Sequence, residues 1–152
     1  LQLLAEETTA TIAGEPALLM HGDTLCTADL AYQRYRRLVH RPAVQAAFLA
    51  LPAAIRRAVA RRLRARSGAA SATKPDHIMD VDPVAVRGAI DRHGARLLIH
   101  GHTHRPGIHA LASAAGPARR VVLGAWHTAG SVLRFAGDEP ELAFEIERGM
   151  DL

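Results

Sequence analysis

The sequence predicts an α/β protein in which a helical segment, about residues 30–75, is inserted into a sandwich of short strands. Short apolar runs bounded by turn residues lie toward both ends of the chain, as expected for strands. The middle of the chain has apolar residues at helical spacing. Two of the apolar runs end at a histidine followed by glycine, His21-Gly22 and His100-Gly101. Polar residues directly after a buried strand are typical of the ligand-binding edge of an open α/β sheet.

The N-terminal part is predicted to contain two strands and then helices. Residues 10–12 and 17–20 flank the turn signal Gly14-Glu15-Pro16. A helical pattern runs from Asp29 to about residue 66, and the small polar residues 67–73 predict a loop.

The C-terminal part is predicted to begin with a capped helix. Asp82 is expected at the N-cap, Pro83 in the first turn and Gly94 at the end of this helix. A strand at 96–99 follows, and further short strands are predicted at 108–112, 119–123, 131–135 and 142–146. With 152 residues, 49% of them hydrophobic, the whole chain fits one domain with a core.

Positive charge is concentrated in the inserted segment, although the net charge is only +4. No Asp or Glu occurs from Leu30 to Pro75, a stretch that holds Arg34, Arg36, Arg37, Arg41, Arg56, Arg57, Arg61, Arg62, Arg64, Arg66 and Lys74. Such a block favours an anionic partner, and a solvated helix face is the alternative. Within it, Ile55, Val59 and Leu63 form an apolar stripe, as in helices that lie on an anionic membrane and equally in helices packed on a domain.

The cysteine content and the length of the apolar runs limit the cellular compartments that we expect for the protein. The single cysteine, Cys26, excludes an internal disulfide framework and suits a reducing compartment as a small buried residue. No apolar run approaches the roughly 20 residues of a membrane-spanning helix, and no signal peptide is visible.

His102 and His104 are the strongest candidates for metal ligands. Two histidines at positions i and i+2 of an extended segment point to the same side, and neutral imidazole binds Mn, Fe and Zn. Gly101 lets the backbone approach the site closely. His100 is interpreted as a supporting residue at the strand end, with a ligand role left open.

His21 is the second candidate ligand because it also follows an apolar strand. Histidines at the ends of two parallel strands can converge on one metal cluster. Asp23 is a candidate ligand or, preferably, a hydrogen-bond partner that orients His21.

These segments resemble the C-terminal motifs of calcineurin-like metallophosphoesterases, and most of all those of the UDP-2,3-diacylglucosamine hydrolases of lipid A biosynthesis. The resemblance runs from near residue 1 to about residue 135. It is carried by Met20–Cys26, Ile78–Val81, His100–Pro106 and Val122–Thr128.

The resemblance implies an incomplete calcineurin-like sandwich with a helical cap at about 30–75. It implies two Mn²⁺ ions, with His21 and His102 on one and His104 on the other. By the same resemblance the residues that hold the substrate are Asp29, Ser67, Ser71, Lys74 and His102.

The implied reaction is hydrolysis of the pyrophosphate bond of a lipid-linked UDP-sugar, UDP-2,3-diacylglucosamine, to UMP and 2,3-diacylglucosamine 1-phosphate. The implied place is the cytoplasmic face of the bacterial inner membrane, on an anionic surface.

The family's N-terminal metal ligands, in Asp-x-His, Gly-Asp and Gly-Asn-x-Asp segments, have no counterpart here. Two dications need anionic ligands to offset their repulsion, so we expect the chain to be part of a longer protein and inactive alone. The alternative is a non-catalytic, phosphoesterase-like module that binds lipid or a partner. A nucleic-acid-binding domain ranks third, and we expect no nucleic-acid partner, because aromatics are 4% of residues and no binding motif is apparent.

Overall fold

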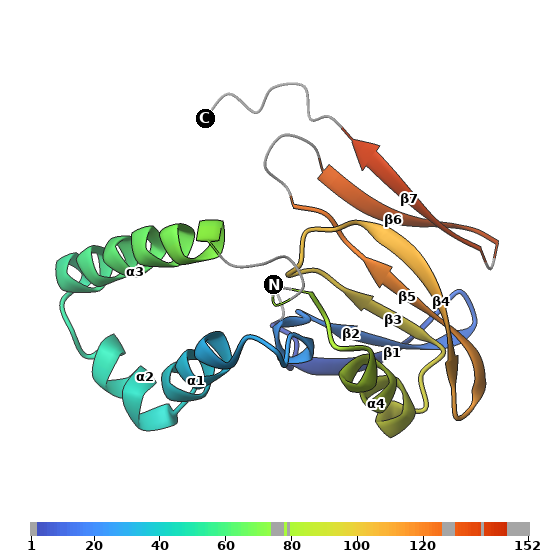
Figure 1. The fold of residues 1–152 in the computed structure, drawn as a ribbon, viewed down its shortest axis with the longest axis horizontal. Coiled ribbons are helices and arrows are strands. Elements are labelled where there is room, and N and C mark those ends of the chain that lie inside the picture. The colour runs from blue at the N-terminus through green and yellow to red at the C-terminus, as the bar shows by residue number, and fades with distance from the viewer. Residues whose placement is uncertain (1–2, 74–77, 79, 126–129, 138, 146–152) are drawn as a thin grey trace. The chain divides into compact units, whose positions relative to one another are not determined.

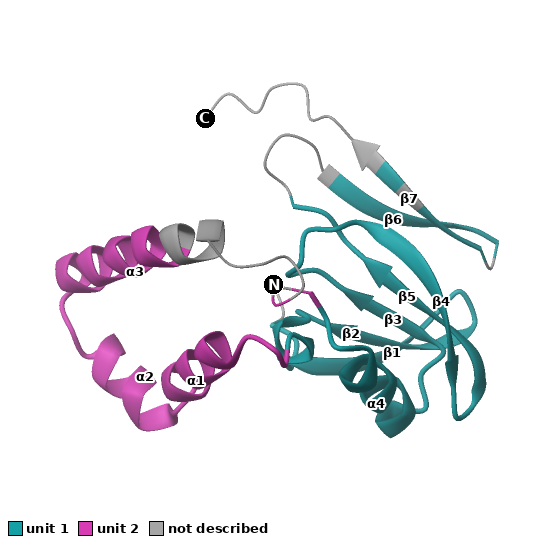
Figure 2. Cartoon of the chain, in the orientation of Figure 1, with its two compact units in different colours: residues 1–26, 81–152 teal, residues 27–80 magenta. Residues whose placement is uncertain are grey.

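The structure, a computed structural model, describes residues 3–73, 78, 80–125, 130–137 and 139–145. The chain divides into two compact units (Figure 2). The first unit contains residues 1–26 and 81–152, and the second contains residues 27–80. The second unit is therefore inserted, in sequence, between the two halves of the first.

The first unit is built on a five-stranded mixed sheet with the strand order β1-β2-β3-β5-β4 (Figure 1). Its central strands β2, β3 and β5 are parallel, and the edge strands β1 and β4 run antiparallel to their neighbours. The strands are β1 (Glu7–Ile12), β2 (Glu15–Met20), β3 (Leu97–His100), β4 (Gly107–Ser113) and β5 (Gly116–Val122). The predicted α/β class and these five predicted strands are confirmed.

Both faces of the sheet are covered, so β3 is buried along its whole length. One face packs against α4 (Pro83–His93), where Leu18, Ile90 and Leu98 are fully buried. The other face carries a second core cluster to which Leu133 and Phe135 contribute. These two residues belong to β6 (Gly130–Ala136), which pairs with β7 (Glu139–Glu145) in a separate two-stranded sheet.

Helix α4 begins and ends where its sequence predicts. The backbone N–H of Val84 donates to Oδ1 of Asp82 at 2.8 Å, which satisfies one of the free donors of the first turn. Gly94 ends the helix with a φ of 58°, in the left-handed region that glycine adopts without a steric penalty. The predicted caps of this helix are confirmed.

The second unit contains three helices, α1 (Leu30–Val39), α2 (Pro42–Leu49) and α3 (Ala53–Thr73). The helical pattern predicted from Asp29 to residue 66 is confirmed, and Pro42 lies in the first turn of α2 as expected. Among the described residues of this unit no apolar side chain is buried, and several large ones are exposed: Leu30, Leu38, Leu49, Ile55 and Leu63. No helix in the part of the chain that the structure describes is long and apolar enough to cross a bilayer.

The predicted loop at residues 67–73 is wrong, because α3 continues to Thr73. Three alanines, Ala69, Ala70 and Ala72, supply the highest helix propensity of any residue type. Gly68 costs only about 1 kcal/mol in a helix interior, and no proline intervenes. A 21-residue helix that has already begun at Ala53 therefore extends through this segment.

Candidate functional site

The candidate site lies where two neighbouring parallel strands end. Strand β2 ends at Met20 and β3 ends at His100, and the two strands pair in parallel with Leu19 opposite Ile99. Parallel strands place their carboxyl ends at the same edge of the sheet. Residues that follow β2 and β3 therefore meet there.

His21 and His102 are brought together at this edge. Nε2 of His21 lies 3.2 Å from Nδ1 of His102, and the two rings are nearly perpendicular, at 75° with centroids 5.0 Å apart. These histidines, which are 81 positions apart, thus lie close together, whereas their convergence on a metal cluster stays a prediction.

The pair fits one divalent ion as a partial set of ligands. Two imidazole nitrogens bound to one ion at about 2.1 Å each lie roughly 3.0–3.4 Å apart. The separation of 3.2 Å between the two nitrogens falls in that range, and it is also the length of a hydrogen bond between the two imidazoles. In addition, Oγ1 of Thr103 is buried without a hydrogen-bond partner among the described residues.

The residues after β3 form a tight turn, so the predicted extended geometry of His102 and His104 is wrong. The Gly101 N–H donates to the His21 carbonyl at 3.1 Å, and the Thr103 N–H donates to the Gly101 carbonyl at 2.7 Å. His102 and His104 have φ values of 62° and 53°, in the left-handed region. This region is sparsely occupied by residues other than glycine, although histidine is enriched among those that occupy it.

Among the described residues the structure does not place His104 in a group of three or more potential metal ligands. His104 is exposed, and within the described ranges no group of three or more His, Cys, Asp or Glu side chains is arranged to hold a metal ion. The binding of a metal by His21 and His102 stays a prediction, and among the described residues no carboxylate completes a group of ligands around them. A two-metal site needs such anionic ligands.

His100 is buried at the end of β3 and has the supporting position that the sequence predicts. Its Nδ1 donates to the Gly101 carbonyl at 2.9 Å. The pKa of the His100 imidazole is lowered to about 4, mainly by burial and to a smaller extent by Arg120, His102 and His109, while the hydrogen bond to Gly101 acts in the opposite direction. His100 is therefore neutral at physiological pH.

Gly22 is a site residue to which the sequence prediction gave no role of its own. Its φ of 100° lies in the left-handed region, and a Cβ at this position would come within 2.6 Å of Nδ1 of His100. Only glycine leaves room for the His100 ring beside the chain that carries His21. The signal in the sequence is a glycine directly after a strand-end histidine.

Asp29, which is predicted to contact substrate, has a structural role that the structure shows directly. It is buried at the N-cap of α1, where its Oδ1 accepts a hydrogen bond from the Tyr32 N–H at 3.1 Å. Asp23 is also buried, within the short 3₁₀ helix η1 (Asp23–Leu25), and its predicted part in orienting His21 stays a prediction. Cys26 is buried, as predicted.

The remaining predicted substrate residues belong to the end of the helical unit. Ser67 is exposed on α3 rather than in a loop, and Ser71 lies in the last turn of the same helix. Lys74 and residues 126–128 of the predicted motif lie outside the described residues.

Comparison with known proteins identifies close relatives across most of the chain. UDP-2,3-diacylglucosamine hydrolase of Serratia proteamaculans is 51% identical over 142 residues, which are 93% of this chain and 59% of the relative. The proteins of the same name from Klebsiella pneumoniae and Escherichia fergusonii are 52% and 50% identical over 140 residues, 92% of this chain and 58% of each relative. No family model matches the chain.

The chain thus spans about three-fifths of the length of these curated relatives. This coverage fits the expectation that the family's N-terminal ligand segments lie outside the sequence. At half identity over more than nine-tenths of its length, the chain is similar to part of the UDP-2,3-diacylglucosamine hydrolases.

Proposed function

We propose that the protein to which this chain belongs is a Mn²⁺-dependent hydrolase that cleaves the pyrophosphate bond of UDP-2,3-diacylglucosamine to UMP and 2,3-diacylglucosamine 1-phosphate. The observation that carries the proposal is the convergence of His21 and His102 at the ends of β2 and β3, in a chain half-identical to proteins of that name. We further propose that the fold is calcineurin-like.

The chain's own residues supply part of the site. His21 and His102 would hold one Mn²⁺ and His104 the second, and the anionic ligands would come from a segment that corresponds to the unmatched part of the relatives. Bound Mn²⁺ polarises a phosphoryl group and activates water. The turn at Gly101 holds the nitrogens of His21 and His102 3.2 Å apart.

We assign the helical unit, residues 27–80, to substrate capture as a cap. In addition to binding metal, His102 contacts the substrate. The other residues that contact the substrate are Asp29, Ser67, Ser71 and Lys74. A lysine provides a mobile point charge for a phosphate group, and serine hydroxyls suit sugar and nucleotide oxygens.

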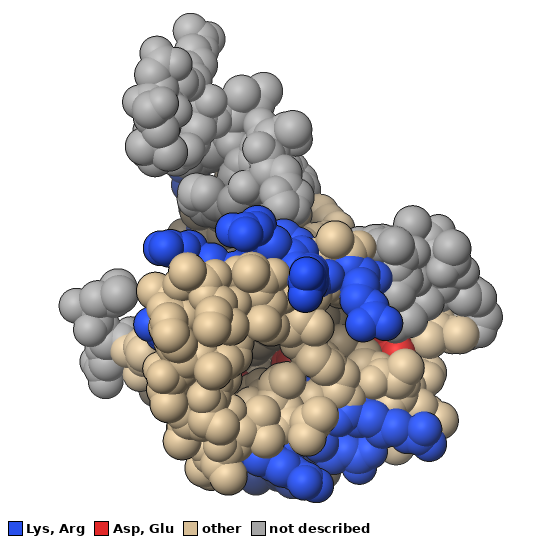
Figure 3. All heavy atoms as spheres, turned by 90° about the vertical axis from the view of Figure 1, so that its left-hand side faces the viewer, with Lys and Arg blue, Asp and Glu red and all other residues tan. Residues whose placement is uncertain are grey.

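The charged and apolar side chains on the surface of the helical unit support the proposal that this unit binds an anionic lipid layer at the inner face of the membrane. Lys and Arg side chains gather in bands on the face shown in Figure 3. Exposed leucines and one exposed isoleucine, Ile55, lie on the same helices as these arginines. A helix that combines both kinds of side chain binds an anionic membrane through charge and apolar burial together.

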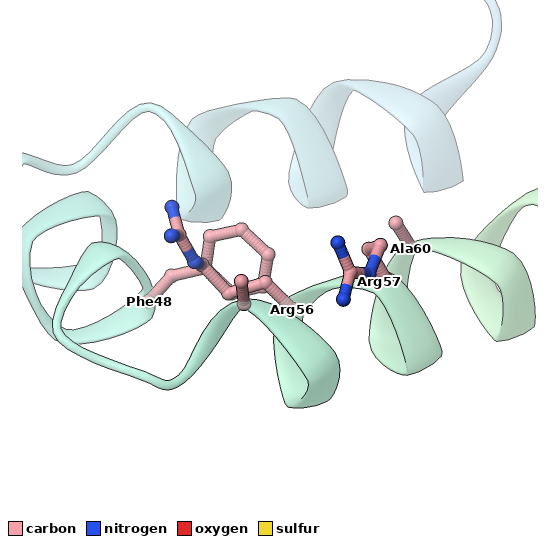
Figure 4. A pocket seen from close by; sticks show the side chains of 5 residues that line it. Phe48, Arg56, Arg57 and Ala60 are labelled. Atoms are coloured by element: carbon pink, nitrogen blue, oxygen red, sulfur yellow. The ribbon is translucent and has the colours of Figure 1, made fainter.

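Two shallow pockets, one beside α3 and one between α3 and Phe48 of α2, combine arginine with apolar side chains. One has a volume of about 340 Å³ and is lined by Phe48, Ala53, Arg56, Arg57 and Ala60 (Figure 4). The other, of about 290 Å³, is lined by Arg57, Ala60, Arg61 and Arg64. The Nε of Arg56 is buried without a partner among the described residues, so it has an unused donor.

The test of the reaction is release of UMP from UDP-2,3-diacylglucosamine by the complete protein with and without Mn²⁺. We expect turnover that needs Mn²⁺ and falls by at least about a hundredfold in His102→Ala, because a metal ligand is lost. Binding of the lipid substrate without any Mn²⁺-dependent turnover would instead favour a non-catalytic lipid-binding module.

The test of the membrane surface is co-sedimentation with vesicles of anionic or neutral phospholipid. A triple change of Arg57, Arg61 and Arg64 to glutamine should weaken binding to the anionic vesicles only, and raised salt should do the same. Arg87→Gln on α4 is the matched control. Equal binding of the triple variant and the wild type would contradict the assignment.

A further inference from the structure

Arg120 on β5 contacts the buried His100 on the neighbouring strand β3. Nη1 of Arg120 lies 3.3 Å from Nε2 of His100. A guanidinium group can only donate hydrogen bonds, so the Nε2 atom must be the acceptor. The neutral imidazole therefore carries its proton on the other nitrogen.

The second contact of His100 requires the same tautomer. Nδ1 of His100 lies 2.9 Å from the Gly101 carbonyl oxygen, which can only accept. Arg120 on one side and the Gly101 carbonyl on the other thus both select the form with the proton on Nδ1. In metal sites, the partner of one imidazole nitrogen commonly fixes the tautomer in this way.

The peptide groups of Gly101 connect this arrangement to both candidate ligands. The Gly101 carbonyl also accepts from the Thr103 N–H at 2.7 Å, which closes the turn that carries His102. The Gly101 N–H donates to the His21 carbonyl at 3.1 Å. His102 itself has a φ of 62°, a conformation that persists only where surrounding contacts hold it.

We propose that Arg120 is a positioning residue of the metal site. By donating to Nε2 of His100 it keeps the proton on Nδ1, and the Nδ1–H in turn holds the Gly101 carbonyl and the His102 turn in place. The effect on metal affinity rests on the proposed function, whereas the effect on the tautomer and the turn does not.

The first test is nitrogen NMR of the metal-free, complete protein. The wild type should show His100 with its proton on Nδ1. Arg120→Met, which removes the donor but keeps a long side chain, should leave only the Gly101 carbonyl to select this tautomer, so the Nε2–H form should become detectable and the amide signals of Gly101 and Thr103 should shift. Arg120→Lys restores a donor and should return these signals part of the way to their wild-type values.

The matched control is Arg119→Met, one position earlier on β5. Arg119 donates to Glu15 at 2.8 Å and to Glu139 at 3.1 Å, and no contact with His100 is seen among the described residues. This change can lower stability, but it should leave the His100 tautomer and the Gly101 signals unchanged. The comparison separates positioning from a general loss of stability.

The second test is Mn²⁺ affinity by calorimetry. Loss of a residue behind a metal ligand typically weakens affinity by about 10–100-fold, and we expect about tenfold for Arg120→Met. Unchanged tautomer and amide signals in Arg120→Met would overturn the inference. So would a changed tautomer with wild-type Mn²⁺ affinity. A wild-type protein that binds no Mn²⁺ would contradict the proposed function and the metal-affinity claim. The NMR comparison would still show whether Arg120 sets the tautomer of His100.

Discussion

At the scale of single residues, the closest packing at the site is between Gly22 and His100. A methyl group on Gly22 would lie 2.6 Å from Nδ1 of His100, and the φ of 100° is unfavourable for any side chain. Gly22→Ala should therefore displace the His100 ring and also pay the backbone cost of about 1–2 kcal/mol.

Gly14→Ala provides the control for the backbone cost alone. Gly14 also has a positive φ, of 76°, but nothing lies within 4 Å of the added carbon. In urea unfolding, Gly22→Ala should lose at least about 1 kcal/mol more than Gly14→Ala, because the steric clash adds to the backbone term. Equal losses would show that the His100 ring moves aside without cost.

The buried His100 predicts a loss of stability in mild acid. Its pKa is about 4 in the folded protein against 6.5 for the free side chain, so between these values the unfolded state binds more protons. The unfolding free energy should fall as the pH decreases from about 6.5 to about 4, by up to about 3 kcal/mol from this residue. Urea titrations across this range should show a flatter profile for His100→Gln than for the wild type, and parallel profiles would contradict the assignment.

The sequence reveals which residues approach each other at the site better than it reveals their conformation. The pairing of His21 with His102 follows from two apolar strands that each lead into a histidine and glycine. The left-handed φ values of His102 and His104 depend on hydrogen bonds of Gly101 and Thr103 to specific partners. A contact such as that between Arg120 and His100 depends on which strands are neighbours in the sheet. A local sequence pattern does not indicate which strands are neighbours.

At the scale of elements, α4 provides a sensitive test of the core on one face of the sheet. Ile90 is fully buried there with Leu18 and Leu98. Ile90→Ala should cost about 2–5 kcal/mol of unfolding free energy, because it removes buried methyl groups and leaves a cavity. Val84→Ala, on the same helix at 78% exposure, should cost less than about 1 kcal/mol, and a similar loss for both would contradict the packing.

A comparison of α4 with the C-terminal end of α3 explains why the limits of α4 were predicted and the end of α3 was not. The limits of α4 are encoded locally, by an N-cap aspartate with a proline and by a final glycine. Residues 67–73 contain small residues that suit a loop or the continuation of a helix. These residues are helical because they follow an existing helix. Adding one residue to a formed helix costs less free energy than nucleating a new helix.

At the scale of the whole molecule, the two units differ in how much apolar surface they bury. The unit of residues 1–26 and 81–152 has two core clusters, while the described part of residues 27–80 has no buried apolar side chain. Amides of β3 and α4 should therefore exchange with deuterium far more slowly than those of α1 to α3. Mass spectrometry after exchange for seconds to hours would test this, and equal protection of both units would contradict it.

The helical unit is inserted within the connection between two strands that are hydrogen-bonded to each other. The free energy needed to close a flexible connection grows only with the logarithm of its length, by about 0.6 kcal/mol for each doubling. The pairing of β2 with β3 is set by the sheet and not by the 54 residues of the inserted unit. Evolution or design can therefore lengthen, shorten or replace this insertion and still leave the two histidines facing each other.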